Sequence, residues 1–90
     1  MKYRVDYSLK AESDIQKLKK TGNKSIRNKL DRLHKELETH PQTGTGKPEY
    51  LKHKKYWSRR IDKEHRLCYE IKDNVVVVLV LSAFGHYEDN

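Results

Sequence analysis

Residues 56–81 constrain the fold more than any other part of this chain, because they read as three strands in direct succession. A polar turn at residues 62–65 separates the first two strands, and Asp73 with Asn74 forms a second tight turn. The valine-rich run at residues 75–81 is too short to cross a membrane and fits a central strand that is buried on both faces. The pattern therefore predicts a three-stranded antiparallel meander.

The N-terminal part of the chain predicts a strand followed by two helices. Residues 2–7 alternate between apolar and charged side chains, as a strand does. Ser8 can cap a helix whose apolar positions recur at spacings of four and three before a turn at residues 21–22. A second helix is expected to begin near Asn23 and to end at His40 and Pro41. Its apolar stripe steps by four, three and four residues and consists of Ile26, Leu30, Leu33 and Leu37.

These elements predict one α+β domain over residues 1–90, with the N-terminal strand, two helices on one face of a sheet, and the three-stranded meander. Hydrophobic residues make up only 34% of the chain and charged residues 37%, whereas soluble domains are usually about 45–50% apolar. We therefore expect a small core. A chain of this kind gains stability when it docks on a partner.

The net charge of +7 indicates a polyanionic partner, although an acidic protein would account for it as well as a nucleic acid would. The chain starts without the apolar stretch of a signal peptide and has no segment that could span a membrane. Its single cysteine, Cys68, cannot form an internal disulfide. We expect a cytoplasmic protein. The five histidines lack the spacing of metal ligands, so no metal site or other cofactor is expected.

Strand parity in residues 56–71 predicts which side chains face the core. The large apolar residues carry odd numbers and are Trp57, Ile61, Leu67, Tyr69 and Ile71. The opposite face then carries the even-numbered residues Tyr56, Ser58, Arg60, Arg66 and Cys68. Two arginines side by side repel each other, so Arg60 and Arg66 suggest an anionic ligand. The alternative is that both pair with Glu64, Glu70 or solvent.

Residues 43–48 contain the turn formers of an irregular loop, which we expect to be functional. The Gly-Thr-Gly-Lys run within it does not predict a nucleotide-binding loop, because the spacing is too short and no strand precedes it.

An ordered set of motifs runs through the C-terminal half of the chain. It consists of GTGKPEYLKH at residues 44–53, WSRRI at 57–61, EHRLCY at 64–69 and HY at 86–87. This set resembles the YoeB/Txe family within the RelE toxin superfamily. The resemblance implies a microbial-ribonuclease-like α+β fold, cleavage of messenger RNA in the ribosomal A site, and neutralisation by a co-expressed antitoxin. The resemblance does not decide whether the protein forms a homodimer.

The resemblance also assigns roles to residues of this chain. It implies Glu49 as the general base and His86 as the general acid. It implies phosphate-binding and transition-state roles for Arg66, Arg60 and Lys52, and it places the penultimate tyrosine of the motif at Tyr87. These types suit cleavage without metal, which needs a base for the 2′-hydroxyl, an acid for the leaving 5′-oxygen, and cations for the phosphorane.

Three departures from the family pattern affect this assignment. The link between Lys52-His53 and Tyr56-Trp57 is about two residues shorter than in the best-known members of the family. Tyr50 stands where a proline is common, and residues 88–90 extend beyond the usual terminal tyrosine. The shorter link could displace Glu49 from Arg60 and Arg66.

Each assigned residue also has an ordinary alternative. Glu49 would then be an exposed loop carboxylate and His86 a surface histidine near the terminus. Lys54 or Lys55 could take the place of Lys52. Two other functions stay open: a noncatalytic ParE-like inhibitor of DNA gyrase, and a basic protein that binds RNA or the ribosome without cutting.

Overall fold

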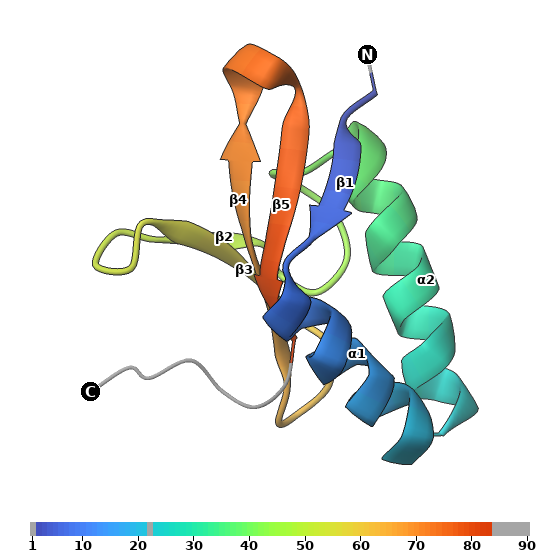
Figure 1. Ribbon diagram of the computed structural model, residues 1–90. Helices are drawn as coiled ribbons and strands as arrows, with labels where there is room; N and C mark the ends of the chain where they lie inside the picture. The colour runs from blue at the N-terminus through green and yellow to red at the C-terminus, as the bar shows by residue number, and fades with distance from the viewer. Residues whose placement is uncertain (1, 22, 84–90) are drawn as a thin grey trace.

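The computed structural model describes residues 2–21 and 23–83, which form one mixed five-stranded sheet and two helices. In chain order the elements are β1 (Arg4–Tyr7), α1 (Leu9–Thr21), α2 (Lys24–Thr39), β2 (Glu49–Leu51), β3 (Tyr56–Arg60), β4 (Arg66–Lys72) and β5 (Val77–Ser82). The strand order is β1-β5-β4-β3-β2. Both helices pack on one side of the sheet, and the β2–β3 hairpin extends away from them (Figure 1).

Side-chain caps begin both helices where the sequence predicts them. The Ala11 amide donates to Ser8 Oγ over 3.0 Å. The Ile26 amide donates to the side-chain oxygen of Asn23 over 3.1 Å. Each cap satisfies one of the amides that a helix leaves without a partner in its first turn. The expected helices at Ser8 and Asn23 are therefore confirmed.

The core lies between the helices and the sheet. From the helices it takes Ala11, Leu18, Leu30, Leu33 and Leu37. From the sheet side it takes Ile61, Leu67, Tyr69, Val78, Val80 and Ala83. Burial of one such leucine or valine side chain contributes about 1.5–3 kcal/mol. The predicted stripe of the second helix is confirmed, since three of its four members are buried.

The α+β fold class is confirmed, but the sheet has one strand more than predicted. β3, β4 and β5 form the antiparallel meander. β2 adds to its outer side, antiparallel to β3. Sequence patterning missed β2 because its three residues are too few for a period to be visible. β1 closes the other side by pairing in parallel with β5.

The turn before β5 also differs from the prediction. Instead of a two-residue turn at Asp73 and Asn74, a short 3-10 helix spans Asp73–Val75. Val76 then adopts a left-handed conformation with φ of 54°. β5 therefore begins at Val77 and not at Val75. Its central position between β1 and β4 is as expected.

Parity places the odd-numbered core residues correctly, but the opposite face of β3 and β4 is not fully exposed to solvent. Ser58 and Cys68 are almost fully buried there. On the core face, sequence reasoning omitted Arg59, which is fully buried. Its odd number puts it beside Trp57 and Ile61, so parity contained this signal.

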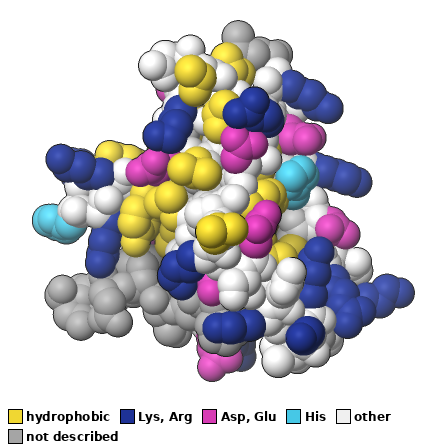
Figure 2. Space-filling model, in the orientation of Figure 1, with side chains coloured by type: hydrophobic (Ala, Val, Ile, Leu, Met, Phe, Trp, Pro, Cys, Tyr) yellow, Lys and Arg dark blue, Asp and Glu magenta, His cyan; other side chains and the backbone are white. Residues whose placement is uncertain are grey.

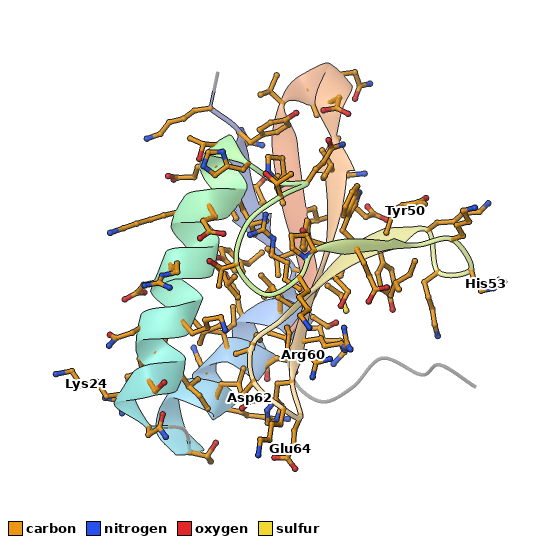
Figure 3. All side chains as sticks on the ribbon, turned by 180° about the vertical axis from the view of Figure 1, so that it is seen from behind. Lys24, Tyr50, His53, Arg60, Asp62 and Glu64 are labelled. Carbon is orange, nitrogen blue, oxygen red and sulfur yellow. The ribbon has the colours of Figure 1, made fainter. Side chains whose placement is uncertain are left out.

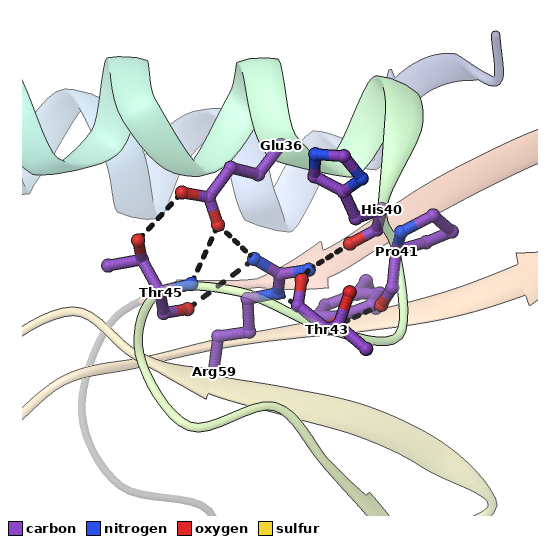
Figure 4. A network of polar contacts seen from close by, with 7 residues as sticks. Glu36, His40, Pro41, Thr43, Thr45 and Arg59 are labelled. Atoms are coloured by element: carbon purple, nitrogen blue, oxygen red, sulfur yellow. Dashed lines mark hydrogen bonds and ion pairs between the residues drawn. The ribbon is translucent and has the colours of Figure 1, made fainter.

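The buried Arg59 holds the long loop between α2 and β2 (Figure 4). Its Nη1 donates to Glu36 Oε1 over 2.8 Å, and its Nε donates to the Tyr69 hydroxyl over 3.0 Å. Its Nη2 donates to the backbone oxygens of His40 and Thr43. A guanidinium inside a protein is tolerated when its donors are satisfied in this way. One side chain of β3 thus ties the loop to α2.

Glu36 is fixed from the loop as well as from Arg59. The Thr45 amide and hydroxyl donate to its two carboxylate oxygens over 2.7 and 2.6 Å. Burial opposes ionisation of this carboxyl group, but hydrogen bonds from Thr45 and Arg59 outweigh it and hold the pKa of Glu36 below its ordinary value. The ionised form is therefore the one that stabilises the fold.

We expect Glu36→Gln to remove an acid-sensitive part of the free energy of unfolding. Because the folded pKa of Glu36 lies below the unfolded value of about 4.3, its contribution is fully present above that pH and is lost as pH falls through the folded pKa. Urea unfolding at neutral pH should show a loss of roughly 1–3 kcal/mol in the variant, and the gap should close in acid. Glu64→Gln is the control. A gap that stays constant with pH would contradict the assignment.

Candidate functional site

The sheet places the predicted base beside a predicted arginine. Glu49 lies opposite Ser58 in the β2–β3 pair, and Ser58 lies opposite Cys68 in the β3–β4 pair. The three positions form a row across three strands. Arg66 is two residues from Cys68 and therefore shares its face. The side chains of Glu49 and Arg66 therefore lie on the same face of the sheet.

An ion pair joins the two groups, with 3.6 Å between Arg66 Nη1 and Glu49 Oε1. This separation exceeds the roughly 2.7–2.9 Å of a charge-assisted hydrogen bond, so the contact is loose. The Glu49 side chain is 54% exposed, and that of Arg66 is 17% exposed. The carboxylate is thus open to a ligand while the arginine is held in place. The shortened link after residue 53 has therefore not separated Glu49 from Arg66.

Arg60 and Arg66 are direct cross-strand partners, which confirms that they are neighbours. Of the alternative partners, Glu70 forms an ion pair with Lys72, and Arg66 forms one with Glu49. Arg60 is exposed, and Figure 3 shows it on the sheet between the hairpin with Tyr50 and His53 and the turn with Asp62 and Glu64. Arg66 therefore borders the carboxylate, and Arg60 is its neighbour on β3.

The loop at residues 43–48 packs against this part of the sheet. The Arg60 amide donates to the Gly46 oxygen over 2.6 Å. Gly46 has φ of 85°, and a Cβ there would lie 2.6 Å from the Arg60 oxygen. Only glycine suits both requirements. The loop thus positions the backbone that enters β2.

Lys52 lies in the exposed turn that follows β2, together with Lys54 and Lys55. His86 and Tyr87 lie outside the described residues. Ala83 is the last described residue, and its amide donates to the buried Asp14 over 3.1 Å. Asp14 also pairs with Lys10 at 3.1 Å. The end of β5 is therefore anchored to α1 three residues before His86.

Other site types find little support in the part of the chain that the structure describes. No group of three or more His, Cys, Asp or Glu side chains there could hold a metal ion. Within the same residues, no helix is both long and apolar enough to cross a membrane. A hollow of about 580 Å³ lies between the helices and β4, with Ile15, Leu30 and His34 in its lining. Of the predicted site residues that the structure describes, Glu49, Lys52, Arg60 and Arg66, none borders it.

Comparison with known proteins decides the family. Residues 7–87 match the family model described as a YoeB-like toxin of bacterial type II toxin-antitoxin systems. The chain belongs to this YoeB-like toxin family. The toxin YoeB of Escherichia coli strain K12 is 43% identical over 58 residues, which are 62% of this chain and 69% of that protein.

Two solved structures from Staphylococcus aureus agree with this YoeB-like fold. The YoeB dimer is 31% identical, with a TM-score of 0.80 over 97% of this chain and 100% of the other. A heterotetrameric YoeB-YefM toxin-antitoxin complex is 32% identical, with a TM-score of 0.76 and the same coverage. The RelE-type α+β fold expected for a YoeB-like toxin is therefore confirmed.

The like charges of this YoeB-like toxin should lower its stability. Opposed like charges on a sheet cost about 0.2–1 kcal/mol, so Arg60→Gln should raise the free energy of unfolding by that amount. Arg60→Lys keeps the charge and should give no such gain. Urea unfolding at low and high salt measures both, and the gain should shrink as salt screens the pair. Equal stability of the Gln and Lys variants would mean that Arg60 and Arg66 do not repel.

Proposed function

We propose that this YoeB-like toxin is a ribosome-dependent endoribonuclease that cuts messenger RNA without a metal ion. The observation that carries the proposal is the open Glu49 carboxylate, which lies 3.6 Å from the guanidinium of the largely enclosed Arg66 side chain. A base and a cation side by side can activate a hydroxyl group and bind the phosphate next to it.

In the proposed reaction, Glu49 takes the proton from the 2′-hydroxyl of the substrate as its oxygen attacks the adjacent phosphorus. The bond from phosphorus to the leaving 5′-oxygen breaks, and His86 donates a proton to that oxygen. The products are a 2′,3′-cyclic phosphate and a 5′-hydroxyl end. Arg66 stabilises the added negative charge of the phosphorane.

The other predicted residues act on the substrate in this proposal. Arg60 is the cross-strand partner of Arg66 and adds a second positive charge beside the phosphate. Lys52 in the turn after β2 contacts the RNA backbone. Tyr87 stacks on a base next to the cut. Because so small a site offers few contacts, the ribosome holds the messenger RNA in line for attack.

A cognate antitoxin and a second copy of the chain are the proposed protein partners. The YoeB-YefM complex and the YoeB dimer of S. aureus support both. An acidic antitoxin segment that covers Glu49 and Arg66 would block the site and match the charge of +7. A toxin that acts on ribosomes works in the cytoplasm, so we propose that location as well.

Cleavage itself is tested by primer extension on a message translated in a cell-free bacterial system. We expect new stops at A-site codons when the purified toxin is added, and far slower cutting of the same RNA without ribosomes. Chelation of trace zinc and manganese, at constant free magnesium, should leave the stops in place. Inhibition of DNA gyrase without RNA cleavage would favour the ParE-like alternative. Binding of ribosomes without cleavage would favour a passive RNA-binding protein.

Single substitutions test the division of labour. Glu49→Ala and His86→Ala should each slow single-turnover cleavage by about 10²–10⁴-fold, because each removes one proton transfer. Arg66→Ala should cost roughly 10²-fold or more. A substrate with a better 5′ leaving group should rescue His86→Ala and not Glu49→Ala, since only the first lacks the proton donor. Equal rescue of both variants would overturn these roles.

A further inference from the structure

We propose that the β2–β3 hairpin forms a second RNA-binding surface, in which Tyr50 stacks on a base and Lys54 with Lys55 contacts the phosphates of a single-stranded segment beside the cut. The inference rests on the proposed function, because it extends the path of the same RNA. It concerns the face of the sheet opposite Glu49 and Arg66.

The aromatic part of this surface is an exposed tyrosine supported by a tryptophan. Tyr50 lies opposite Trp57 in the β2–β3 pair, and the ring centroids are 5.6 Å apart at an interplanar angle of 58°. Tyr50 is 48% exposed, whereas Trp57 is half-buried against the core. The tilted contact fixes the tyrosine ring and leaves part of it open. Such a ring can stack on any base.

The charged part of the surface is the turn that joins the two strands. Residues 52–58 contain three lysines and no acidic residue. Lys52, Lys54 and Lys55 are exposed, and none of them forms an ion pair within residues 2–21 and 23–83. The Lys54 and Lys55 amides both donate to the Leu51 oxygen, over 3.1 and 2.7 Å. The backbone of this turn is therefore held in a defined shape.

The hairpin stands clear of the body of the molecule. Its tip extends away from the helices in Figure 1, and the same part of Figure 2 carries basic side chains and a histidine. Tyr50 and His53 are labelled along it in Figure 3. A ligand can therefore approach the tip from more than one side.

The edge position of β2 connects this surface to the candidate active site. β2 is the outermost strand, and Glu49 and Tyr50 are consecutive residues of it. Their side chains point to opposite faces of the sheet. A strand of RNA with its scissile phosphate between Arg66 and Glu49 can reach Tyr50 by passing around the edge of β2.

The chemistry of the surface favours RNA over an acidic peptide. The face of an aromatic ring carries negative charge and therefore gives no attraction to a carboxylate, whereas it can stack on the face of a base. Lysines attract both ligands equally. Only a nucleic acid uses the tyrosine and the lysines together.

Fluorescence anisotropy with a labelled 2′-O-methyl RNA of about 12 nucleotides tests the proposal, since single-strand sites span roughly 4–16 nucleotides and this RNA cannot be cleaved at its 2′ positions. Tyr50→Ala should weaken binding by about 5- to 150-fold without changing the dependence on salt. Tyr50→Phe keeps the ring and should bind like the wild type. Val75→Ala is the matched control, because Val75 is also an exposed apolar residue.

The lysines give a different signature in the same assay. Removal of two phosphate contacts by Lys54→Gln with Lys55→Gln should lower the slope of log affinity against log salt by about 1.4. The exposed pair Lys20→Gln with Lys24→Gln, at the helix ends, removes the same charge and should change the slope much less. Circular dichroism of each variant checks that the fold is kept.

Three results would overturn the proposal: wild-type binding by Tyr50→Ala, equal losses in the Phe and Ala variants, or equal slopes for the two lysine pairs. Displacement of the RNA by polyglutamate with the same potency in wild type and Tyr50→Ala would also overturn it, in favour of an acidic protein ligand. Binding that behaves as expected in a protein that cuts no messenger RNA on ribosomes would instead refute the proposed function.

Discussion

The buried pair of Arg59 and Glu36 is the interaction on which the candidate site depends. A guanidinium without solvent is costly unless its donors are satisfied, and here the partners come from α2, β4 and the loop that leads to β2. The same side chain therefore fixes the path of a loop that has no regular structure. Because this loop delivers Glu49 to the edge of the sheet, an electrostatic contact inside the protein sets the position of a carboxylate on its surface.

The face of the sheet that carries Arg60 and Arg66 holds an unfavourable arrangement of charge. Arg60 and Arg66 oppose each other on the adjacent strands β3 and β4. The Glu49 carboxylate, 3.6 Å from Arg66, offsets their repulsion only in part. The small core must offset this cost. A bound phosphate or an acidic protein segment would relieve it, so that either occupant of the face stabilises the folded chain by mass action.

Much of the architecture could be predicted, because helices and paired strands leave regular patterns in the sequence. Ser8, Asn23 and the leucine stripe located the helices, and parity placed Arg60 beside Arg66. β2 could not be found in this way, since three residues at an edge show no period. Arg59 was missed because a charged residue is expected in solvent, and its partner Glu36 lies 23 residues away in the sequence. The roles of Glu49, Lys52, His86 and Tyr87 came from resemblance and stay predictions.

The parallel pairing of β1 with β5 joins the first and the last strand of the described sheet. Ser8 Oγ donates to the Leu81 oxygen across 73 positions of sequence, next to the last rungs of that pairing. Such a contact forms late, because most of the chain must be present before the two strands can meet. During synthesis the sheet is thus incomplete until β5 has left the ribosome. Until then β1 lacks the neighbouring strand with which it pairs in the described sheet.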